Sequence, residues 1–150
     1  MEPENSLSNK LLNEGHKLTV LVRRPEKITI SYNNLGVAKG DILDFESVQK
    51  AVAGQDAVLS ALGHKKFFLK TTVLSVGTKN IIRAMNEHKV MRLICITSLG
   101  TNDSRFRLGL YYTLFVIPFI VFFYFKDKAK QEKLIRESNL LWTIVRPGQR

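Results

Sequence analysis

The chain has 150 residues, a formal net charge of +10 and 45% hydrophobic residues, which predicts one globular domain with a core of its own. Its single cysteine, Cys95, lies in an apolar run and excludes a disulfide framework. The three histidines are scattered without metal-ligand spacing, so we expect no metal site.

The positive charge raises the question of a nucleic acid partner. The basic residues are spread along the chain, and there is no helix-turn-helix, zinc-finger or RNA-recognition signature. We therefore expect no nucleic acid partner, since a basic surface suits an anionic cofactor equally well. The first residues lack the basic-then-apolar pattern of a signal peptide, which predicts a cytoplasmic location.

Short apolar runs alternate with segments of helical spacing along the chain. The runs predict strands at 18–22, 37–39, 57–62, 92–97 and 142–145. The helical segments end near 14 and span 44–53, 72–88 and 127–138, with loop and a poorly formed helix at 28–35. Helical spacing places five residues on the apolar face of the segment 72–88: Val73, Val76, Ile81, Ala84 and Met85. Asp44 is the expected N-cap of the second helix, with Gly15 and Gly54 as stops of the first two. This alternation predicts an α/β fold with a doubly wound parallel sheet.

The segment Leu108–Phe125 is apolar throughout and rich in aromatic residues. Its length reaches the lower limit for a membrane-spanning helix, but strands of one sheet are predicted on both sides of it. We therefore favour an insertion at 105–125 that touches a membrane surface or covers a substrate. A transmembrane helix and a simple core helix are the alternatives.

Four polar or glycine-containing features follow successive predicted strands. They are Arg23-Arg24, Gly40-Asp41, Ala61-Leu62-Gly63 and Thr97-Ser98. In open parallel sheets, ligands bind beyond the carboxyl ends of the strands, so this succession predicts a dinucleotide site. Two arginines that follow a buried strand suit a site for an anionic group, and the alternative is a strand that ends in solvated charge.

The sequence resembles the atypical short-chain dehydrogenase/reductases, the NmrA-like and flavin-reductase-like NAD(P)H-binding proteins. The matching segments, in the family's order, are GHKLTVLVRRPEKI, KGDILDFESVQKAVAGQDAVLSALG, TTVLSVGTKNIIRAMNEHKVMRLICITSLG and DKAKQEKLIRESNLLWTIVRPG. They cover nearly everything from Gly15 to Gly148. The resemblance implies a Rossmann-like domain that binds a dinucleotide.

The resemblance also implies roles by position. Arg23 and Arg24 would hold the 2′-phosphate, which favours NADP(H) over NAD(H), and Asp41 and Ile42 would flank the adenine. Ala61, Leu62 and Gly63 would pass beside the pyrophosphate and ribose, and Ser98 would lie near the nicotinamide. The substrate is not identified, although the apolar insertion favours a small hydrophobic or planar molecule.

Catalysis in the wider superfamily uses a serine and a Tyr-x-x-x-Lys pair. Tyr124 and Lys128 have that spacing, and Ser98 precedes them. A neighbouring ammonium lowers the pKa of a tyrosine, which would let Tyr124 donate a proton while Lys128 binds the ribose. The alternatives are an aromatic side chain at the edge of the insertion and a solvated lysine at a helix start.

The resemblance begins after the glycine-rich turn that anchors the pyrophosphate in the family. Residues 1–14 diverge from that pattern, and the chain ends soon after a strand. We therefore expect a single incomplete domain over 1–150, truncated at both ends, with weakened cofactor binding. Two functions follow: an NADPH-preferring oxidoreductase, active or inactive, or a non-catalytic NAD(P)H-sensing or assembly protein of the same fold.

Overall fold

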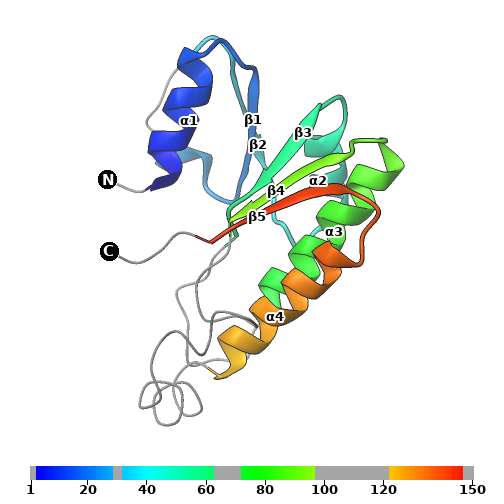
Figure 1. Cartoon of the computed structure of the whole chain (residues 1–150). Coiled ribbons are helices and arrows are strands. Elements are labelled where there is room, and N and C mark those ends of the chain that lie inside the picture. Colours follow the sequence, from blue (N-terminus) through cyan, green and yellow to red (C-terminus); the bar gives the residue numbers. More distant parts are fainter. Residues whose placement is uncertain (1–2, 29–31, 63–71, 97–121, 147–150) are drawn as a thin grey trace.

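The computed structural model describes residues 3–28, 32–62, 72–96 and 122–146 (Figure 1). The helices are α1 (Pro3–Asn13), α2 (Phe45–Val52), α3 (Val73–Glu87) and α4 (Phe122–Arg136), with a short 3₁₀ turn, η1 (Pro25–Lys27). The strands are β1 (Leu18–Val22), β2 (Leu35–Lys39), β3 (Ala57–Ser60), β4 (Arg92–Ile96) and β5 (Leu141–Val145). All strand pairs are parallel, and the α/β Rossmann-like class is confirmed.

The strands form two sheets, one of β1 and β2 and one in the order β3-β4-β5. In the doubly wound order, one further strand lies between the positions that β1 and β3 take here. The described residues provide no strand there, and no backbone pairing joins β1 to β3. Both sheets still cover one core, because Leu21 of β1 and Val58 of β3 pack against the same buried cluster.

The helices divide between the two sides of the strands. In Figure 1, α1 lies on the other side of the strands from α3 and α4, which run side by side. The core lies between the strands and the layer of α2, α3 and α4. Its buried members are Val48, Val52, Ile81, Ala84, Met85, Val90, Leu93, Cys95, Ile135 and Leu140.

Local signals in the sequence account for the element ends. The Asp44 carboxylate accepts a hydrogen bond from the Ser47 backbone N–H at 3.2 Å, as expected for the N-cap of α2. Its pKa is lowered, first by the Ser47 hydroxyl that donates to it. Gly15 and Gly54 have φ of 84° and 72°, so both predicted helix stops are left-handed.

Several predicted boundaries and one residue of a predicted apolar face were wrong. β2 begins two residues earlier than predicted, and β3 ends at Ser60 rather than at residue 62. On α3 the buried side chain near the start is Leu74, whereas Val76, placed by spacing on the apolar face, is exposed. The helix predicted from residue 127 begins at Phe122, because the aromatic residues 122–125 extend it toward its N-terminus.

The predicted insertion at 105–125 falls mostly outside the described residues. Residues 105–121 are not described, and Phe122 to Phe125 form the beginning of α4. Among the helices that the structure describes, none has both the length and the apolar character needed to cross a membrane. A membrane or substrate contact through Leu108–Phe125 therefore stays a prediction.

Candidate functional site

The predicted dinucleotide residues follow β1, β2 and β3 directly. Arg23 and Arg24 follow β1 and are exposed to solvent, and Arg24 leads into the turn η1. Because all strand pairs are parallel, the carboxyl ends within each sheet share one edge. Two exposed guanidinium groups at such an edge fit a phosphate ester, which they can bind with paired hydrogen bonds.

Asp41 organises the loop after β2 through its own backbone and side chain. Its Oδ1 accepts a hydrogen bond from the Leu43 N–H at 2.9 Å, and its carbonyl accepts one from the Asp44 N–H at 3.0 Å. This closed turn carries the half-buried Ile42 toward α3. Gly40, just before it, lies so close to Ser47 that a Cβ would stand 2.6 Å from that residue's Cβ.

The loops after β2 and β3 meet on α3. A Cβ on Gly77 would stand 2.8 Å from Cγ1 of Ile42 and 3.1 Å from Cδ1 of Leu62. The Asn80 side chain on α3 also donates to the carbonyl of Ile42 at 2.9 Å and to that of Leu43 at 3.2 Å. The first half of α3 therefore supports two predicted cofactor-binding residues that are twenty positions apart in the sequence.

Gly77 and Asn80 were not among the predicted site residues. A glycine inside a predicted helix is a recognisable signal, because it costs about 1 kcal/mol relative to alanine and often marks a close approach. Asn80 carries no comparable signal, since its role depends on a loop that lies 37 or 38 positions earlier.

Lys128 lies in the second turn of α4 and is only 3% exposed. Burial lowers the pKa of its ammonium, while its electrostatic neighbours Cys95 and Glu132 act in the opposite direction. Burial likewise raises the pKa of the Cys95 thiol, as expected for an inert core cysteine. Cys95 is paired with Ser60 in register, so Lys128 lies near the carboxyl ends of β3 and β4.

A buried ion pair supports this part of α4. Glu132 is fully buried, and its Oε2 accepts a hydrogen bond from Nη2 of Arg146 at 2.6 Å, just after β5. Gln131, also fully buried, donates to Oγ1 of Thr78 on α3 at 3.1 Å. These contacts fix α4 against both α3 and β5.

Three predicted site residues cannot be placed in this way. Gly63 and Ser98 lie outside the described residues. Tyr124 belongs to the first turn of α4, but its side chain also lies outside the described part. The arrangement of a Ser98–Tyr124–Lys128 catalytic group therefore stays a prediction.

Carboxylates cap two of the described helices at their N-termini. Asp44 accepts from the Ser47 N–H of α2, and Asp127 accepts from the N–H groups of Leu74 and Ser75 on α3. These N–H groups are thus not offered to a pyrophosphate, whose negative charge these carboxylates would also repel. Neither of these two helix N-termini therefore provides free N–H groups at Ser47, Leu74 or Ser75 for a pyrophosphate.

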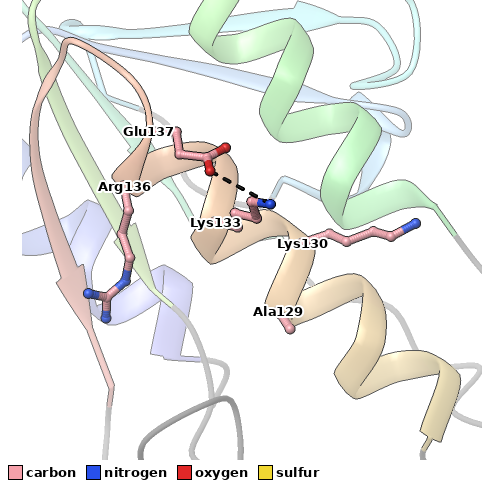
Figure 2. A pocket seen from close by; sticks show the side chains of 5 residues that line it. All are labelled: Ala129, Lys130, Lys133, Arg136 and Glu137. Carbon is pink, nitrogen blue, oxygen red and sulfur yellow. Dashed lines mark ion pairs between the residues drawn. The ribbon is translucent and has the colours of Figure 1, made fainter.

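An open depression of about 400 Å³ lies away from these residues, on α4. It is lined by Ala129, Lys130, Lys133, Arg136 and Glu137. Figure 2 shows the charged side chains there, with Nζ of Lys133 3.7 Å from Oε1 of Glu137. Both partners are well exposed, so the pair contributes little to stability. No predicted site residue lines this depression.

Comparison with known proteins gives a consistent result. A family model described as NAD(P)H-binding matches residues 5–149. An uncharacterised chloroplastic protein of Arabidopsis thaliana is 27% identical over 154 residues, covering 93% of this chain and 52% of that protein.

Two solved structures are also similar to this chain. A Rossmann-fold NAD(P)-binding family protein from Shigella flexneri is 27% identical, with a TM-score of 0.67 over 93% of this chain and 58% of that one. A short-chain dehydrogenase/reductase from Veillonella parvula, solved in complex with NADP, is 18% identical, with a TM-score of 0.73. It is matched over 94% of this chain and 62% of that one. The chain thus spans between half and two thirds of the length of these proteins.

Proposed function

The chain belongs to the NAD(P)H-binding family, and from this premise we propose that it is an NADPH-preferring, oxidoreductase-like domain. The main support is that Ile42 and Leu62 both pack against Gly77, so that two predicted cofactor-binding loops lie on the same helix, α3. The exposed Arg23 and Arg24 at the end of β1 support a preference for the 2′-phosphate.

The proposal assigns each group a role in binding. Arg23 and Arg24 would hold the 2′-phosphate, Asp41 and Ile42 would flank the adenine, and Ala61, Leu62 and Gly63 would line the ribose and pyrophosphate. NADPH supplies a hydride when it is bound. Ser98, Tyr124 and Lys128 would position the substrate and deliver the proton that accompanies the hydride.

Lys128 suits such a role because burial favours its neutral form while Glu132 helps it to keep its proton. A lysine balanced in this way can exchange a proton with a neighbouring group. In its protonated form, Lys128 would orient the ribose and lower the pKa of Tyr124.

Substitution of Arg23 tests the cofactor preference. We expect Arg23→Gln to weaken NADPH binding about tenfold or more, as for the loss of a charge-assisted hydrogen bond, with little change for NADH. Lys17→Gln is the matched control, because it removes the same charge at the exposed opposite end of β1. Dissociation constants from the fluorescence of the reduced cofactors provide the measurement. Equal losses for NADPH and NADH would refute the assignment of Arg23.

A second candidate function is non-catalytic sensing of NAD(P)H by the same site. Sensing needs the residues that bind the cofactor, such as the exposed Arg23 and Arg24, but it needs no proton donor. Oxidation of NADPH in the presence of flavins or quinones distinguishes the two. An oxidoreductase consumes NADPH and loses that activity in Tyr124→Phe and Lys128→Met, whereas a sensor only binds it.

A further inference from the structure

The first turn of α3 is capped by a residue of another helix. Thr72 occupies the N-cap position but makes no hydrogen bond there with its side chain. Instead, Oδ2 of Asp127 accepts from the Leu74 N–H at 3.0 Å, and Oδ1 accepts from the Ser75 N–H at 3.2 Å. Asp127 is 3% exposed and lies more than fifty positions away in the sequence.

This contact is specific in its chemistry. Both carboxylate oxygens are used, each by a backbone N–H that has no partner within its own helix at this position. A negative charge at a helix N-terminus also interacts favourably with the helix dipole, more strongly where water is excluded. Asp127 therefore holds the start of α3 against α4 in a defined orientation.

The part of α3 held in this way carries the candidate dinucleotide site. Gly77, less than one turn after Ser75, contacts Ile42 and Leu62, and Asn80 binds the backbone of the loop after β2. A shift of the first turn of α3 would therefore displace both loops together. On α4, Asp127 is adjacent to Lys128, so one short segment joins the cap to the candidate catalytic lysine.

We propose that Asp127 is a positioning residue that fixes the first turn of α3, and through Gly77 the two cofactor-binding loops, relative to Lys128. The proposal rests on the proposed function for its link to NADPH. The cap itself is independent of that function, because it is a contact between two helices.

Amide hydrogen exchange and NADPH affinity, measured on the full chain, test this role. In Asp127→Ala we expect faster exchange at Leu74 and Ser75 by about tenfold or more, the size expected for loss of a helix cap. The Met85 amide, farther along the same helix, should stay unchanged. NADPH should bind about tenfold more weakly, and Asp127→Asn, which keeps one acceptor oxygen, should lie between the wild type and Asp127→Ala.

Glu87→Gln is the matched control. It removes the same charge from the last turn of α3, where Glu87 pairs with Arg83 on the exposed surface. We expect exchange at Leu74 and Ser75 and the NADPH affinity of this variant to match the wild type. All binding is measured at a temperature at which circular dichroism shows each variant to be folded, and Asp127→Asn replaces Asp127→Ala if the latter does not fold.

The outcomes separate the two proposals. Exchange at Leu74 and Ser75 that does not change in the Asp127 variants would overturn the positioning role. So would faster exchange combined with wild-type NADPH affinity, since the cap would then be only structural. A wild-type chain that does not bind NADPH refutes the proposed function and with it the link to cofactor binding, and the exchange rates then decide the cap by themselves.

Discussion

Gly77 on α3 lies so close to Ile42 in the loop after β2 that a Cβ at position 77 would stand 2.8 Å from the Ile42 Cγ1. The same Cβ would stand 3.1 Å from the Cδ1 of Leu62. Real Cβ atoms essentially never approach another heavy atom to 2.8 Å, so an alanine would force Ile42 to shift and would also crowd Leu62. Ile42 and Leu62, which lie in different loops, can thus pack at this position because residue 77 has no side chain.

We therefore expect Gly77→Ala to destabilise the protein, although alanine is the better helix former. The overpacking costs about 1–3 kcal/mol, and the gain in helix propensity offsets about 1 kcal/mol of it. NADPH affinity should fall as well, because Ile42 and Leu62 are displaced. Urea unfolding and NADPH titration measure the two effects.

Gly36→Ala is the control for this substitution. A Cβ on Gly36 would meet Oγ1 of Thr19 at 3.6 Å, an ordinary contact, and the residue lies in β2. Its NADPH affinity should equal that of the wild type. If Gly77→Ala proved as stable as the wild type and bound NADPH equally well, Gly77 would have no supporting role.

The buried ion pair between Glu132 and Arg146 should be important for stability. In Glu132→Gln, Arg146 keeps its charge but loses the carboxylate 2.6 Å away, in a setting where the Arg146 side chain is only 23% exposed. Breaking a buried pair in this way costs about 3 kcal/mol or more. The free energy of unfolding in urea measures the loss.

Glu137→Gln provides the comparison on the same helix. Its pair with Lys133 is exposed on both sides, so its loss should cost less than about 1 kcal/mol. Similar losses in the two variants would contradict a buried, energetically important pair at Glu132.

The buried ammonium of Lys128 should make stability depend on pH. Its pKa in the folded protein lies below the ordinary lysine value of 10.5 because of burial. Between these two values the unfolded chain binds more protons than the folded chain, so the free energy of unfolding rises with pH across that interval. Below the folded pKa the full cost of burying the charge remains.

Urea unfolding between about pH 7 and 11 measures this contribution, when Lys128→Met is compared with a reference protein that keeps Lys128. Both proteins should carry Cys95→Ala, because the raised pKa of the buried thiol gives stability the opposite dependence on pH in this range. We expect the difference in stability between the two proteins to shrink as the pH rises. A difference that is independent of pH would show that Lys128 has an ordinary pKa.

Much of the secondary structure was predictable because its signals are local. The strand at 18–22 and the N-cap at Asp44 agree with the structure residue for residue, since an apolar run and a capping side chain act within a few positions. The start of α4 was predicted five residues late, at 127 rather than 122. There the aromatic residues continue the helix without a capping signal.

The candidate site was predictable only in part. Arg23, Asp41 and Leu62 each follow a predicted strand. Because the predicted sheet is parallel, the sequence predicts that these residues lie at the carboxyl ends of the strands. The sequence did not predict the support that α3 provides through Gly77 and Asn80. Helical spacing reports which face of a helix is apolar, but it does not report which loop packs on that face.

By itself, the sequence determined the α/β class, most of the elements and the family resemblance. Hydrophobic period, helix caps and motifs each depend on residues that are close together in the sequence. The tertiary structure alone decided the packing of Ile42 and Leu62 on Gly77, the burial of Lys128 and the capping of α3 by Asp127. Each of these depends on contacts between residues far apart in the chain. Such contacts exist only once the helices have packed on the strands, so neither partner shows a sign of the other in the sequence.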